Sequence, residues 1–61
     1  MNQAPFFVGE QVEKYTGDYQ LTGEVRAIFT TTKDKIRVVV EHTPGFLHIY
    51  NPEQLRSLER V

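Results

Sequence analysis

Apolar and polar residues alternate along most of the chain, which is typical of β-strands with one buried face. Residues 11–15 alternate around Val12 after a turn signal at Gly9-Glu10, and this predicts a first strand. The segment Thr16-Gly17-Asp18 ends that strand. A longer alternation over residues 21–31 predicts a second strand.

The second strand is expected to bend at Gly23, because glycine permits a β-bulge. Strict alternation gives this strand two faces. One face carries Val25, Ala27 and Phe29, and the other carries Glu24, Arg26 and Ile28.

The second half of the chain predicts two further hairpin strands and a short helical turn. Residues 36–41 place Ile36, Val38 and Val40 on one face and form a hairpin with the second strand. Pro44-Gly45 is typical of a type II turn and leads into a strand at residues 46–50. Asn51 before a proline and helix formers predicts one 3₁₀ or α turn, and a last short strand is expected at residues 58–61.

These elements favour an all-β fold, a small SH3-like barrel of about five strands with one 3₁₀ turn. Residues 6–61 form the barrel domain, and residues 1–5 are expected to be a flexible tail. A chain of 61 residues without cysteine has a marginal core, so self-association is its expected support.

Composition argues against several classes of function. Seven Lys and Arg against eight Asp and Glu give a net charge of −1 without a basic run, so nucleic acid is an unlikely partner. No apolar stretch reaches the roughly 18 residues of a membrane span, and the lack of cysteine and of a leader pattern favours a cytoplasmic protein. His42 and His48 lack further ligands, so no metal is expected. The scattered carboxylates do not indicate acid–base hydrolysis.

The strand at residues 46–50 carries the candidate chemistry. Leu47 and Ile49 point one way, while Phe46, His48 and Tyr50 point the other. If the aliphatic pair faces the core, two aromatic rings and an imidazole form an exposed patch. Alternatively, Phe46 and Tyr50 complete the core and His48 is a solvated strand residue.

Several motifs occur in an order and at a spacing that resemble a known family. They are Val8-Gly9-Glu10-Gln11-Val12-Glu13-Lys14, Gly17, Gly23-Glu24-Val25, Pro44-Gly45-Phe46-Leu47-His48-Ile49-Tyr50 and Leu58-Glu59-Arg60. From about residue 7 to residue 61 the chain resembles the plasmid-encoded type II (type B) dihydrofolate reductases, which are small trimethoprim-insensitive enzymes with an SH3-like barrel.

The resemblance implies an NADPH-dependent reduction of dihydrofolate in a pore shared by four subunits with 222 symmetry, and it implies trimethoprim insensitivity. Leu47-His48-Ile49-Tyr50 stands where the family has Val-Gln-Ile-Tyr. Ile49 would offer backbone groups and an apolar surface to both rings, and Tyr50 would position the cofactor. Lys14 would attract the NADPH phosphates and the folate tail. No side chain would donate the proton.

The chain departs from the family at the same strand. His48 replaces glutamine, Phe46 replaces serine, Thr43 replaces an interface histidine, and the hairpin before Pro44 is shorter. A neutral imidazole still has one donor and one acceptor, so paired His48 rings can replace paired amides. The alternative is a non-enzymatic SH3-like binding module of bacterial or phage origin that uses Phe46, His48 and Tyr50 as a contact patch.

Overall fold

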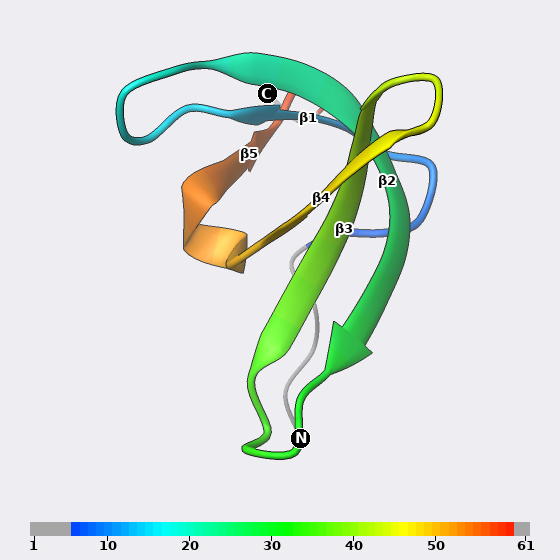
Figure 1. The fold of residues 1–61 in the computed structure, drawn as a ribbon, viewed down its shortest axis with the longest axis vertical. Coiled ribbons are helices and arrows are strands. Elements are labelled where there is room, and N and C mark those ends of the chain that lie inside the picture. Colours follow the sequence, from blue (N-terminus) through cyan, green and yellow to red (C-terminus); the bar gives the residue numbers. More distant parts are fainter. Residues whose placement is uncertain (1–5, 60–61) are drawn as a thin grey trace.

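The computed structural model describes residues 6–59, so the predicted tail at residues 1–5 and the final residues 60 and 61 lie outside it. It contains five strands and one 3₁₀ turn, and the all-β prediction is confirmed (Figure 1). Within residues 6–59 no helix is long and apolar enough to cross a membrane. The elements are β1 (Gln11–Lys14), β2 (Leu21–Thr30), β3 (Ile36–Thr43), β4 (Phe46–Tyr50), η1 (Pro52–Gln54) and β5 (Leu55–Ser57).

The strands form one antiparallel sheet in the order β4-β3-β2-β1-β5. Consecutive strands are neighbours from β1 to β4, and β5 returns to the free side of β1. β2 is the long bent ribbon of Figure 1, which pairs with β1 at its start and with β3 along the rest of its length. Glu24, where the two pairings meet, lies opposite both Gln11 and Glu41.

The core lies inside this bend and consists mainly of valines. Val12, Val25, Val38 and Val40 come from three strands and are fully buried. Burying each such side chain stabilises the fold by about 1.5–3 kcal/mol. The remaining core residues are Phe6, Tyr50 and Leu55, with Ile28 packed against them. The shared face predicted for β3 is therefore confirmed at Val38 and Val40.

The predicted faces of β2 are wrong beyond Val25, because the bulge lies at Arg26 rather than at Gly23. Val25 pairs with Val40 and Ala27 pairs with Val39, so Arg26 is an extra residue in β2. Every later side chain is turned to the opposite face. Ile28 therefore packs on the core, while Ala27 and Phe29 are exposed.

Gly23 has a different role, which is close contact between β2 and β3. A Cβ atom there would lie 2.6 Å from Val40 Cγ1 and 2.7 Å from the Glu41 carbonyl oxygen. The turn prediction at Pro44-Gly45 is confirmed, since Gly45 has a φ of +84° and Thr43 pairs with Phe46.

The 3₁₀ turn is confirmed, and the position of the last strand is wrong. In η1 the Asn51 N–H donates to Gln54 Oε1 at 3.0 Å. β5 follows at once, because Leu55 is buried in the core and Ser57 pairs with Val12. Leu58, where the strand was predicted to begin, lies after β5 and is exposed.

Candidate functional site

β4 presents its aliphatic residues to solvent and its last aromatic residue to the core. Leu47 and Ile49 are 55% and 61% exposed, whereas Tyr50 is 4% exposed and His48 is half-buried. Phe46, beside the turn, is exposed. The prediction of an aliphatic core face on this strand is therefore wrong. The alternative prediction, that Phe46 and Tyr50 complete the core, is right for Tyr50 and wrong for Phe46.

The exposed aliphatic residues of β4 continue across the neighbouring strands. Ile49 pairs with Val39, and Val39 pairs with Ala27. Residues directly opposite each other in an antiparallel pair point to the same face, so these three side chains form one row. Leu47 lies on the same face, two residues before Ile49. We call Ala27, Val39, Leu47 and Ile49 the outer apolar strip.

The same part of β4 is an open sheet edge. Within residues 6–59, β4 is last in the strand order and has a neighbour on one side only. The Thr31 N–H donates to the Lys35 carbonyl, so alternation directs Val38 and Val40 toward β4. Their partners on β4 are Tyr50 and His48. The backbone groups of Leu47 and Ile49 consequently point to the open edge.

Lys14 lies away from this surface, and its ammonium group is bound within the β1–β2 loop. The side chain is 4% exposed, and Nζ donates to the carbonyl oxygens of Thr16 and Tyr19. The same atom lies 3.9 Å from the centre of the Tyr19 ring, a cation–π contact. Gly17 leaves room for it, because a Cβ atom there would be 2.9 Å from Nζ.

Tyr50 links the two histidines of the chain. Its hydroxyl lies 2.7 Å from His42 Nε2 and 3.5 Å from His48 Nδ1, and the two imidazole rings are 5.5 Å apart. His42 Nδ1 lies 2.8 Å from the Thr22 carbonyl oxygen. Burial, followed by a side-chain hydrogen bond with Tyr19, raises the pKa of Tyr50 to about 12. The phenol therefore stays neutral at physiological pH.

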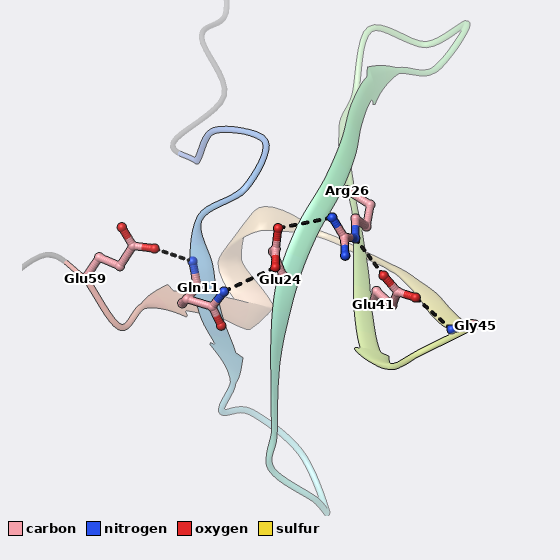
Figure 2. Close-up of polar contacts among 6 residues, drawn as sticks. All are labelled: Gln11, Glu24, Arg26, Glu41, Gly45 and Glu59. Atoms are coloured by element: carbon pink, nitrogen blue, oxygen red, sulfur yellow. Dashed lines mark hydrogen bonds and ion pairs between the residues drawn. The ribbon is translucent and has the colours of Figure 1, made fainter.

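A polar network crosses the outer side of β1, β2 and β3 (Figure 2). Arg26 is at its centre, with Nε 2.6 Å from Glu41 Oε1 and Nη1 3.1 Å from Glu24 Oε2. The Gly45 N–H donates to Glu41 Oε2 at 2.7 Å. At the other end, the Gln11 side chain donates to Glu24.

The network sets the charge on its members. The hydrogen bond to Glu41, followed by the charge of Glu24, raises the pKa of Arg26. The Gly45 N–H, followed by Arg26, lowers the pKa of Glu41. Arg26 and Glu41 are therefore ionised near neutral pH, and the bulge that places Arg26 between the two carboxylates is held by charge-assisted hydrogen bonds.

An open pocket of about 250 Å³ lies beside this network, and His42, Thr22 and Pro44 line it together with Arg26. Within residues 6–59, no group of three or more His, Asp or Glu side chains is placed to hold a metal ion. The pocket therefore offers hydrogen bonds and charge rather than a ligand set.

Sequence reasoning missed His42 and Arg26 as parts of this arrangement. His42 is the extra residue at a second bulge, between the pairs Glu41–Leu47 and Thr43–Phe46. A bulge depends on the partner strand, so alternation along a single strand does not reveal it. The only sign of this arrangement in the sequence is that Glu, Arg and His residues occur on strands predicted to be adjacent.

Comparison with family models, with curated proteins and with solved structures gives no match to this chain.

Proposed function

We propose that this chain is an SH3-like barrel that assembles with copies of itself through β4, and that the assembled form reduces dihydrofolate with NADPH. The strand order β4-β3-β2-β1-β5, the bend in β2 and the 3₁₀ turn before β5 support the barrel. These features are typical of a small barrel in which four strands form an antiparallel meander and the last strand pairs with the first.

One observation supports assembly most strongly, namely the exposure of Leu47 and Ile49 on an open edge. Apolar side chains in one row across three strands favour contact with another protein surface. Unpaired backbone groups beside them favour pairing with a further strand. A second copy supplies both the apolar surface and the pairing strand, because around a two-fold axis the outer apolar strip meets its own copy and the edge of β4 meets its own copy.

The same residues fit a flat heterocyclic ligand. The backbone groups of Ile49 and Leu47 provide donors and acceptors at the edge, and their side chains provide an apolar surface for a ring. NADPH, when bound, supplies the hydride. The contribution of the protein is to hold the nicotinamide and pteridine rings face to face, so that transfer becomes effectively intramolecular.

Two residues assigned by the resemblance are occupied elsewhere in the single subunit. Tyr50 is in the core, and the Lys14 ammonium is bound by Thr16 and Tyr19. Tyr50 would therefore act through its contacts with His48, and Lys14 would have to leave its carbonyl partners to bind phosphate. This burial favours the second candidate, a module that binds a protein partner through the outer apolar strip without chemistry.

Sedimentation and an NADPH oxidation assay test the proposal together. We expect a species of four chains that oxidises NADPH in the presence of dihydrofolate and trimethoprim. Leu47→Lys places a charge in the outer apolar strip and should abolish both assembly and activity. Leu58→Lys is the matched control, because Leu58 is similarly exposed, at 48%, and lies outside the strip.

The outcomes separate the two candidates. A monomeric protein without activity contradicts both assembly and the reductase function. An assembled protein that Leu47→Lys dissociates, but that does not oxidise NADPH, contradicts the enzyme and supports a contact module. Equal effects of Leu47→Lys and Leu58→Lys would contradict a specific role for the outer apolar strip.

A further inference from the structure

β4 exposes apolar side chains on both of its faces. Leu47 and Ile49 on the outer face are 55% and 61% exposed, and Phe46 on the opposite face is 54% exposed. The Phe46 ring lies 5.0 Å from the His48 ring, which places it on the His48 side of the strand. A second surface packed flat on the sheet would cover only one of these faces. A strand added beside β4 covers side chains on both faces, so the exposure favours contact along the edge.

The open edge of β4 is short, because backbone groups beyond each of its ends are already used. Leu47 and Ile49 direct their N–H and carbonyl groups outward. Beyond Leu47, the Gly45 N–H donates to Glu41 Oε2 at 2.7 Å. Beyond Ile49, both backbone groups of Asn51 are bonded within the 3₁₀ turn, at 3.0 Å each. Pairing along β4 therefore depends on the outward groups of two residues.

These groups favour one antiparallel register with a second copy. A two-fold axis normal to the sheet reverses the strand direction, so the two β4 strands meet antiparallel. An axis at Leu47 sets Ile49 opposite Gly45, whose N–H is used. An axis at Ile49 sets Leu47 opposite Asn51, whose N–H and carbonyl are both used. An axis at His48 sets Leu47 opposite the Ile49 of the second copy, and every outward N–H and carbonyl of the edge then has a partner.

We propose that two copies of this chain pair their β4 strands antiparallel about a two-fold axis at His48. The inference rests on the assembly proposed above and specifies its partner and its register. Leu47 of each copy exchanges backbone hydrogen bonds with Ile49 of the other, and His48 lies opposite its own copy. β4 contains no charged residue and no proline, which are common protections of a strand that stays unpaired.

This register joins the two outer apolar strips into one surface. Ala27, Val39 and Ile49 form a row in each copy, and Leu47 of the second copy extends that row across the joint. The two-fold axis places an equivalent row beside it. Both rows lie on the same face of the joined sheet, so the apolar area doubles without interruption. Two such pairs can stack through this surface, which gives the species of four chains expected above.

A cysteine scan tests the register, because the chain contains no cysteine of its own. Opposite residues at a non-hydrogen-bonded position of an antiparallel pair have Cα atoms about 4.5 Å apart, a distance that a disulfide spans. His48→Cys should therefore cross-link to its own copy under mild oxidation. Leu47→Cys and Ile49→Cys, each alone, should not, because each Cα atom would lie about 8 Å from its own copy.

An equimolar mixture of Leu47→Cys and Ile49→Cys tests the same register and leaves His48 unchanged. In the mixture the two thiols lie opposite each other, with Cα atoms about 5.5 Å apart, so a mixed dimer should form. Leu58→Cys is the control, because Leu58 is similarly exposed, at 48%, and lies outside β4. Non-reducing electrophoresis and mass spectrometry measure the products. His48→Cys and the mixture should cross-link about 10²-fold faster than Leu58→Cys, because assembly raises the effective thiol concentration.

The outcomes distinguish the register from the proposed function. Self-cross-linking of Leu47→Cys or Ile49→Cys in place of His48→Cys would overturn the register and leave the assembly standing. An assembled protein in which neither His48→Cys nor the mixture cross-links would do the same. The expected pattern in a protein that does not oxidise NADPH would support the register and contradict the reductase alone. A wild type that sediments as a single chain would overturn the register and the assembly together.

Discussion

The ammonium of Lys14 organises the β1–β2 loop from within. It is bound by the carbonyl oxygens of Thr16 and Tyr19 and covered by the Tyr19 ring, and the missing side chain of Gly17 leaves it room. Buried charges are stable only where such partners replace water. At this position the chain uses a charged residue as part of its core.

Gly17→Ala should therefore cost more stability than Gly45→Ala, although both positions have positive φ. The backbone strain is about 1 kcal/mol in each case. At Gly17 the new Cβ also displaces Lys14 Nζ, which adds about 1 kcal/mol of lost hydrogen bonding. At Gly45 nothing lies within 4 Å. Urea unfolding of both variants measures the difference.

Lys14→Met provides the control for this comparison, because it keeps an unbranched side chain and removes the ammonium. In its background Gly17→Ala should cost only the backbone strain, so the two substitutions should be non-additive. Additive effects would show that the Lys14 contact does not limit the side chain at position 17.

Tyr50 gives the fold a dependence on alkaline pH. Its folded pKa of about 12 lies above the ordinary value of 10.0, so the native state favours the neutral phenol. This contribution is complete below pH 10 and disappears as pH rises toward 12, with a total of about 3 kcal/mol.

The measurement is the difference in unfolding free energy between the wild type and Tyr50→Phe at several pH values. Phenylalanine has no proton to lose, so the difference should shift in favour of the variant above pH 10. A constant difference across this range would contradict the burial of the phenol.

At the scale of elements, β2 shows what alternation along a strand can and cannot predict. Its bounds, like those of β3 and β4, follow from hydrophobic pattern and turn residues, and the structure agrees to within a few residues. Its faces do not follow, because the Arg26 bulge depends on pairing with β3. The buried face of β4 was predicted wrongly for another reason. Its residues are apolar on both faces, so the pattern does not distinguish core from surface.

Gly23 permits the close approach of β2 and β3, and Gly23→Ala tests this. The added Cβ would meet the Glu41 carbonyl oxygen at 2.7 Å, and a backbone atom cannot rotate away. We expect a loss of at least about 3 kcal/mol, larger than for Gly17→Ala, by urea unfolding. A smaller loss than at Gly17 would show that the two strands can separate at little cost.

For the whole molecule, the core identified above is small, and association is the expected compensation. Stability that depends on assembly depends on concentration, because mass action favours the folded, assembled state. The thermal midpoint should rise as the chain is concentrated, and Leu47→Lys should remove the rise while Leu58→Lys keeps it. A midpoint independent of concentration in the wild type would contradict this dependence.

The return of β5 to β1 has a consequence for biosynthesis. β1 lies between β2 and β5, and the Gln11 N–H donates to the Glu59 carboxylate across 48 positions of sequence. While the ribosome has not yet released the β5 segment, β1 has one neighbour and Leu55 is missing from the interior. The chain therefore has to emerge at least as far as β5 before this sheet can form, and a product cut short before Leu55 should be a substrate for proteases.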